Sequence, residues 1–226
     1  MSRIAIFFLL VVAPILAMLL ALLGVKSIPT NPLGWFLLLV GVAYTAGVVF
    51  VYFIRKERFW ESAFGGATAH EERGDHSLWF ITLGMGAAFY ISPVEYLYLS
   101  TILPRNAWMP FSGVGLVILG IALFIWARRA LRENYSGHVS VKTGQALVQN
   151  GPYRFIRHPA YAGQLLMALG VALGYASLIG LLAIPALLLP GLVYRIRVEE
   201  KLLAEHFGTQ YTQYMRRTKR LFPGLW

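Results

Sequence analysis

The chain has 226 residues, of which 58% are hydrophobic and 13% charged, and it contains no cysteine. An average soluble domain carries about 25% charged residues, so this composition excludes a disordered chain and argues against an ordinary cytosolic domain. The lack of cysteine excludes a disulfide scaffold, a thiolate nucleophile and a cysteine-based metal site. For a membrane protein, the length suits one compact bundle of about five to seven spans at roughly 20 apolar residues each.

Apolar segments along the chain predict an all-α, polytopic membrane helix bundle. Four spans are expected at residues 4–25, 33–54, 78–103 and 111–127. The third of these is expected to kink at Pro93. The apolar run of the first span, about 20 residues, exceeds the 7–15 of a signal peptide, so we expect this segment to be retained.

Residues 159–194 form an apolar region that is too long for one helix. They are expected to divide near 174–177 into a tight hairpin, in which Pro185 and Pro190 make the final segment irregular. The bundle then has six spans, or five if the hairpin does not cross the membrane completely.

The net charge of +10 is explained by membrane topology. With both termini on the cytoplasmic side, 18 of the 20 lysines and arginines lie inside, and only Lys26 and Arg105 lie outside. This is the bias of the positive-inside rule. Together with attraction to anionic lipid headgroups, it accounts for the positive charge, so a nucleic-acid partner is excluded.

The chain is asymmetric in its chemistry. Residues 1–127 are predicted to supply the N-terminal spans, and 128–226 to form the catalytic region. The histidine-rich and acidic segment at 70–76 lacks the His-Glu-x-x-His spacing of a metal site, so it is interpreted as a solvated loop. Glu95 lies inside the third span, where an ionisable group is costly. A structural role is favoured, in which the carboxyl snorkels, is neutral or bonds a neighbour, and a function is the alternative.

A first polar cluster precedes the fifth apolar segment. Gly151 and Pro152 mark a turn, and Pro159 suits the first turn of the helix that follows. The helix dipole favours an anion there, so Arg157, His158 and free backbone N–H groups are expected to hold a carboxylate or phosphate. The alternative is a basic anchor at the membrane surface.

A second cluster follows the last span, in the run from Arg195 to Tyr214. Arg195 and Glu199 are i, i+4 neighbours on a helix and form either a structural ion pair or the second wall of a pocket. Further on, Phe207, Tyr211 and Tyr214 continue an apolar stripe at helical spacing, which is expected to cover the bundle or lie on the membrane.

Taken in order, the two clusters resemble the isoprenylcysteine carboxyl methyltransferase family, whose relatives include phospholipid methyltransferases. The first motif runs from His138 through Gly151-Pro152-Tyr153 to Arg157-His158-Pro159-x-Tyr161-x-Gly163. The second runs from Arg195-x-x-x-Glu199-Glu200 to Phe207-Gly208-x-x-Tyr211. The resemblance covers residues 131–223.

This resemblance implies a membrane methyltransferase that uses S-adenosyl-L-methionine, releases S-adenosyl-L-homocysteine and takes a lipophilic acceptor from the bilayer. It implies that Arg195 faces the acceptor as the catalytic candidate, and it implies no metal. Gln145 departs from the family pattern, in which histidine is usual. With Arg157 added from the anion-binding cluster, the candidate cofactor-binding residues are His138, Gln145, Ala146, Leu147, Val148, Tyr153, Arg157, His158, Pro159, Ala160, Tyr161 and Glu199.

The residue types in these clusters suit methyl transfer, an in-line displacement that needs alignment and exclusion of water. Tyr153 and Tyr161 are expected to pack on the adenine or face the sulfonium. His158 is expected to hold the methionine carboxylate, and Glu199 a ribose hydroxyl or the amine. A carboxylate acceptor needs no base, whereas an amine or thiol is helped by one.

Two other functions are compatible with parts of the sequence. NADPH-dependent sterol or steroid reductases share a His-Pro-x-Tyr-x-Gly segment but usually continue with an acidic residue, where this chain has Gln164. A non-enzymatic transport module is expected to show repeats or paired broken helices, which the sequence lacks. The identity of the acceptor, the oligomeric state and the source membrane stay open.

Overall fold

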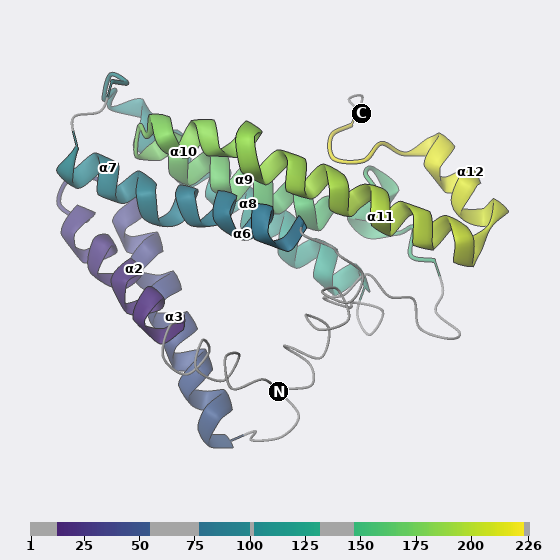
Figure 1. Ribbon diagram of the computed structural model, residues 1–226, viewed down its shortest axis with the longest axis horizontal. Coiled ribbons are helices and arrows are strands. Elements are labelled where there is room, and N and C mark those ends of the chain that lie inside the picture. The colour runs from purple at the N-terminus through teal and green to yellow at the C-terminus, as the bar shows by residue number, and fades with distance from the viewer. Residues whose placement is uncertain (1–12, 55–76, 100–101, 132–146, 224–226) are drawn as a thin grey trace.

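The computed structural model describes residues 13–54, 77–99, 102–131 and 147–223, and helices dominate these ranges. The helices are α2 (Ala13–Ser27), α3 (Leu33–Ile54), α6 (Ser77–Gly86), α7 (Ser92–Tyr98), α8 (Trp108–Leu131), α9 (Pro159–Gly174), α10 (Leu178–Ala183), α11 (Leu189–Phe207) and α12 (Thr209–Arg217). Helices α6 to α11 run side by side, and the α2–α3 hairpin diverges from them (Figure 1). Helix α12 lies beyond the end of α11.

Prolines produce the irregular turns that the sequence predicts. A π-helical turn at Ala87–Ile91 joins α6 to α7, with Pro93 in the first turn of α7. A second π-helical turn at Ile184–Leu188 contains Pro185 and joins α10 to α11. A proline lacks the N–H that would bond four residues back, so the helix widens locally rather than ending.

Three helical rods in the described ranges are long and apolar enough to cross a membrane: Trp79–Tyr98, Trp108–Leu131 and Leu178–Phe207. Shorter apolar helices cover Ile15–Ser27, Leu33–Ala43 and Pro159–Gly174. Apolar helices therefore occupy the predicted positions, while the count of six complete spans stays a prediction. The beginning of the first predicted span and the 70–76 loop lie outside the described residues.

Glu95 has a structural role, the alternative that the sequence favours. Its carboxylate is buried in α7 and accepts hydrogen bonds from Ser177 Oγ at 2.5 Å, Leu178 N at 3.1 Å and Ile179 N at 3.2 Å. These backbone N–H groups belong to the first turn of α10 and have no acceptor inside that helix. Glu95, which belongs to α7, therefore caps the N-terminus of α10, and its negative charge also suits that end of the helix.

The two basic residues expected on the outer side lie together at the α7 end of the bundle. Lys26 Nζ donates to Tyr98 Oη at 2.6 Å, and Arg105 Nη2 donates to the Tyr96 carbonyl oxygen at 2.7 Å. The Arg105 guanidinium also lies 4.4 Å from the centre of the Tyr96 ring. Cations paired with tyrosines are typical of the interface between membrane and water.

Helices α8 and α9 pack at backbone distance because glycines face one another. A Cβ placed on Gly120 would lie 2.7 Å from the Gly163 carbonyl oxygen, and a Cβ on Gly113 would lie 2.6 Å from that of Gly170. Small residues allow such close approach in lipid, where packing rather than the hydrophobic effect holds helices together. This contact fixes the position of α9, the helix that carries the first polar motif.

Gly120→Ala is expected to lower the free energy of unfolding by about 1–3 kcal/mol, because α8 and α9 must move apart to admit the methyl group. Gly115→Ala is the matched control, since a Cβ there meets nothing within 4 Å on the same helix. That change is expected to be neutral or stabilising. Thermal unfolding in detergent compares the variants, and equal midpoints would contradict this account of the packing.

Candidate active site

The chain approaches α9 through a segment that the C-terminal tail holds in place. Residues Gly151–Arg154 form a 3₁₀ turn, and the next residues pair with the tail through a parallel bridge between Ile156 and Lys219. Arg157 N donates to the Lys219 carbonyl oxygen at 2.8 Å, and His158 N donates to that of Arg220 at 2.9 Å. Helix α9 then begins at Pro159, as predicted.

A buried carboxylate, Glu200, joins this approach segment to α11 and the tail. It accepts from Arg157 Nε at 2.7 Å and Arg220 Nε at 2.8 Å, and it lies 3.3 Å from His158 Nε2. Arg157 Nη1 also donates to the carbonyl oxygens of Met215, at 3.2 Å, and Thr218. Opposite charges and hydrogen bonds thus offset the cost of burying these groups.

The predicted residues His158, Tyr161, Arg195 and Glu199 come together beside Glu200. His158 Nδ1 lies 3.9 Å from Glu199 Oε2, and the His158 and Tyr161 rings stack with centroids 5.7 Å apart. Tyr161 Oη donates to Glu199 Oε2 at 2.9 Å and accepts from Arg195 Nε at 3.1 Å. The start of α9 and the middle of α11 therefore form one polar cluster.

The two neighbouring glutamates differ in their access to a ligand. The Glu200 side chain is 7% exposed and faces cations of its own chain, whereas the Glu199 side chain is 32% exposed. Successive residues on a helix point about 100° apart. Glu199 is thus accessible from outside the protein, while Glu200 holds the surrounding segments.

Helix α12 packs against the approach segment after a turn at Gly208, whose φ of +54° favours glycine. Tyr211 and Tyr214 lie on its buried face, as their helical spacing predicts. Tyr214 Oη donates to the Tyr153 carbonyl oxygen at 2.7 Å. Burial raises the pKa of Tyr214 to about 12, so its hydroxyl stays protonated and keeps this bond. The last helix thereby holds the turn that carries Tyr153.

The other predicted residues divide into three groups. Pro159 and Ala160 form the first turn of α9, and Leu147 and Val148 lie half-buried before the 3₁₀ turn. Arg157 is present at the cluster, but Nε and Nη1 of its guanidinium bond to Glu200 and backbone carbonyls, an arrangement that positions protein segments. Outside the described residues lie His138, Gln145 and Ala146.

The groups present fit S-adenosylmethionine. This cofactor carries a sulfonium, an ammonium, a carboxylate, ribose hydroxyls and an aromatic base. Glu199 offers a partly exposed carboxylate for a cation or hydroxyl, and His158 and Tyr161 offer stacked rings beside it. The sequence interpretation missed Glu200, Arg220 and the pairing of the tail. The Glu199-Glu200 doublet was the available signal, because adjacent side chains on a helix point about 100° apart and so face different surroundings.

Glu200→Gln is expected to lower the free energy of unfolding by about 3 kcal/mol, because it removes the buried counter-charge that Arg157 and Arg220 share. Glu205→Gln, an exposed site on the same helix, is the matched control and should change little. Thermal unfolding measures the loss, and protease cleavage of the C-terminal tail reports its release from the approach segment. Equal stability of the two variants would show that Glu200 does not hold these segments.

Comparison with known proteins places these elements in a family. Residues 108–210 match the family described as phospholipid methyltransferase, a range that includes α9, α10 and α11. Protein-S-isoprenylcysteine O-methyltransferase A of Arabidopsis thaliana is 29% identical over 145 residues, covering 59% of this chain and 71% of that protein. Uncharacterized protein YpbQ of Bacillus subtilis is 30% identical over 123 residues, covering 54% and 71% respectively.

The fold is also similar to that of a solved structure. It is that of the eukaryotic intramembrane Ras methyltransferase ICMT (isoprenylcysteine carboxyl methyltransferase), solved without a monobody. The TM-score is 0.51 at 21% sequence identity, with 84% of this chain and 66% of that chain covered. Together these matches identify an integral, multi-pass membrane protein. The chain belongs to the family of S-adenosylmethionine-dependent membrane methyltransferases that includes the isoprenylcysteine carboxyl methyltransferases and the phospholipid methyltransferases.

Proposed function

We propose that this enzyme methylates the carboxylate of a lipophilic or amphiphilic acceptor at the cytoplasmic face of the membrane, with S-adenosylmethionine as the methyl donor. The observation that carries the proposal is the connected series His158, Glu199, Tyr161 and Arg195. One end of this series has a partly exposed carboxylate beside stacked rings, and the other has a buried guanidinium. The two ends suit a cationic cofactor and an anionic acceptor.

Glu199, His158 and Tyr161 form the cofactor side of the proposed site. S-adenosylmethionine, when bound, supplies a methyl group activated by its sulfonium. The Glu199 carboxylate binds the ammonium or a ribose hydroxyl, and the Tyr161 ring contributes a face that attracts positive charge. Helix α12 lies beside this side, where it contacts Arg157 and Tyr153, and a bound cofactor would displace water from Glu199 and so strengthen the electrostatic contacts there.

Arg195 forms the acceptor side. Its side chain is 5% exposed, and its Nε is held by Tyr161, so the orientation of the guanidinium is restricted. A planar guanidinium matches a carboxylate in charge and geometry. A carboxylate acceptor is already nucleophilic and needs no base. This suits the cluster, because the Glu199 carboxylate already accepts a hydrogen bond from Tyr161. The Arabidopsis relative is named as a protein-S-isoprenylcysteine O-methyltransferase, which also favours an oxygen acceptor on a lipidated group.

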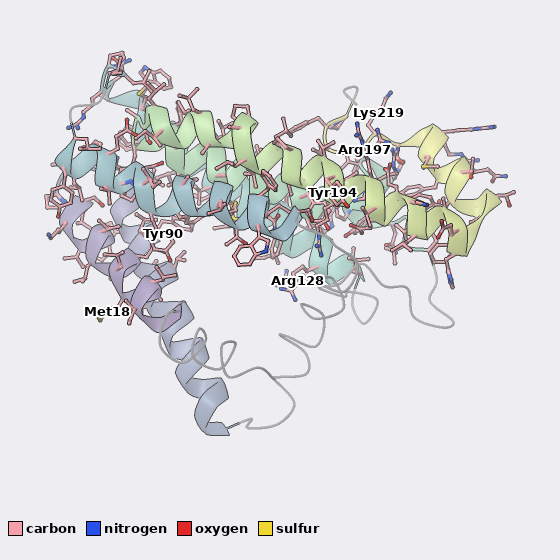
Figure 2. The ribbon with its side chains drawn as sticks, viewed as in Figure 1. Met18, Tyr90, Arg128, Tyr194, Arg197 and Lys219 are labelled. Atoms are coloured by element: carbon pink, nitrogen blue, oxygen red, sulfur yellow. The ribbon has the colours of Figure 1, made fainter. Side chains whose placement is uncertain are left out.

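The distribution of charge supports a cytoplasmic site with both termini on that side. Arg128, Arg197 and Lys219 lie in the part of the molecule that holds α11 and α12, whereas Met18 and Tyr90 lie in the other half (Figure 2). The opposite end carries Lys26 and Arg105. Because cytoplasmic segments carry the excess of lysine and arginine, this arrangement supports the proposed cytoplasmic location of the site.

The cofactor assignment is tested by calorimetric titration of the detergent-purified protein with S-adenosylhomocysteine and, separately, with NADPH. We expect saturable binding of S-adenosylhomocysteine and none of NADPH. His158→Ala and Glu199→Ala are expected to weaken binding about tenfold or more, since each removes a contact with a charged or ring group of the ligand. Both variants should stay folded in thermal unfolding.

Three outcomes of this titration count against the proposal. NADPH binding alone would move the protein to the reductases that share its His-Pro-x-Tyr-x-Gly segment. Binding of neither compound by folded protein would remove the enzymatic assignment of the site. Unchanged affinity of both variants would remove His158 and Glu199 from the cofactor site.

Arg195→Ala is expected to reduce turnover of a lipophilic carboxylate, such as N-acetyl-S-farnesylcysteine, by tenfold or more while changing S-adenosylhomocysteine affinity less than threefold. The reason is that the guanidinium contacts the acceptor rather than the cofactor. Arg197→Ala is the matched control, because Arg197 is exposed on the same helix. The reverse pattern, with cofactor affinity lost and turnover at saturating cofactor kept, would place Arg195 in the cofactor site.

A further inference from the structure

The hydroxyl of Tyr211 has no role in the contacts described so far. Tyr211 lies on the inner face of α12 and is 1% exposed. Its hydroxyl oxygen is buried and has no hydrogen-bond partner among the residues that the structure describes. Tyr214, one turn further on, gives the contrast, because its hydroxyl donates to the Tyr153 carbonyl oxygen at 2.7 Å. A buried hydroxyl without a partner is destabilising, so its position calls for an explanation.

The surroundings of Tyr211 belong to the candidate active site. Its ring packs edge-on against Tyr214 with centroids 5.9 Å apart. On the same helix, the Met215 carbonyl oxygen accepts from Arg157 Nη1 at 3.2 Å, and Arg157 Nε donates to Glu200 at 2.7 Å. Burial first, and then the Glu200 carboxylate, raise the pKa of Tyr211 far above its ordinary value, so the hydroxyl stays protonated and is available as a donor.

We infer, building on the proposed function, that the Tyr211 hydroxyl donates a hydrogen bond to the bound cofactor, which makes Tyr211 a further cofactor-binding residue. The cofactor has acceptor atoms in its carboxylate, ribose and adenine, and any of these satisfies a phenol O–H. The two tyrosines of α12 then have different tasks. Tyr214 holds the protein segment that carries Tyr153, and Tyr211 holds the ligand.

The test compares Tyr211→Phe with Tyr214→Phe, since each change removes one hydroxyl and leaves the ring in place. Tyr211→Phe is expected to weaken S-adenosylhomocysteine binding about 2- to 12-fold, the range of a neutral hydrogen bond. Its thermal midpoint without ligand should equal that of the wild type or exceed it, because an unsatisfied hydroxyl is gone. Tyr214→Phe should lower that midpoint, because it leaves the Tyr153 carbonyl without its donor.

The outcomes separate this inference from the proposed function. If the wild-type protein binds S-adenosylhomocysteine and Tyr211→Phe binds it equally well, the inference fails while the cofactor assignment stands. If Tyr211→Phe loses stability without ligand to the same extent as Tyr214→Phe, its hydroxyl serves the fold and the inference also fails. If the folded wild-type protein does not bind S-adenosylhomocysteine, the proposed function fails and the inference fails with it.

Discussion

The candidate site depends on the buried Glu200 carboxylate, because it connects parts of the chain that are far apart in sequence. Arg157 comes from the approach to α9, Arg220 from the tail, and Glu200 itself from α11. Each of these segments is short or lies at the end of an apolar helix, where lipid provides no specific partner. A carboxylate with two guanidinium partners supplies direction as well as attraction. The same group lies beside His158 and so ties this framework to the predicted site.

Close packing of α8 and α9 provides the rigid base for that framework. Lipid tails are as apolar as the helix surfaces, so burying leucine adds little, and backbone contact through glycine does more. The glycines that face each other set the distance between the two helices within narrow limits. Since α9 begins at Pro159, immediately after His158, a shift of α9 would move the stacked His158 and Tyr161 rings relative to α11.

Much of this arrangement could be predicted from local sequence, and the remainder could not for physical reasons. The lengths of the apolar segments predicted the positions of the helices. Pro93 and Pro185 predicted where two of the helical segments become irregular. The order of the two motifs predicted that His158 and Glu199 belong to one pocket. The bridge between Ile156 and Lys219 and the role of Glu200 depend on tertiary contacts over long separations, for which neither periodicity nor composition carries a signal. The assignment of Arg157 to an anionic ligand stays a prediction; its guanidinium bonds to the buried Glu200, a partner that local sequence does not indicate.

The Tyr161 hydroxyl connects the cofactor side of the proposed site to the acceptor side. Tyr161 donates to Glu199 and accepts from Arg195, so its oxygen lies between the group assigned to the cofactor and the group assigned to the acceptor. In-line displacement requires the two reactants to be held at a defined distance and angle. A hydroxyl that bonds to both walls couples their positions, and the stacked His158 ring restricts the tyrosine further. On the proposed assignment, Tyr161 and its packing align the two reactants, and a carboxylate acceptor needs no additional acid or base.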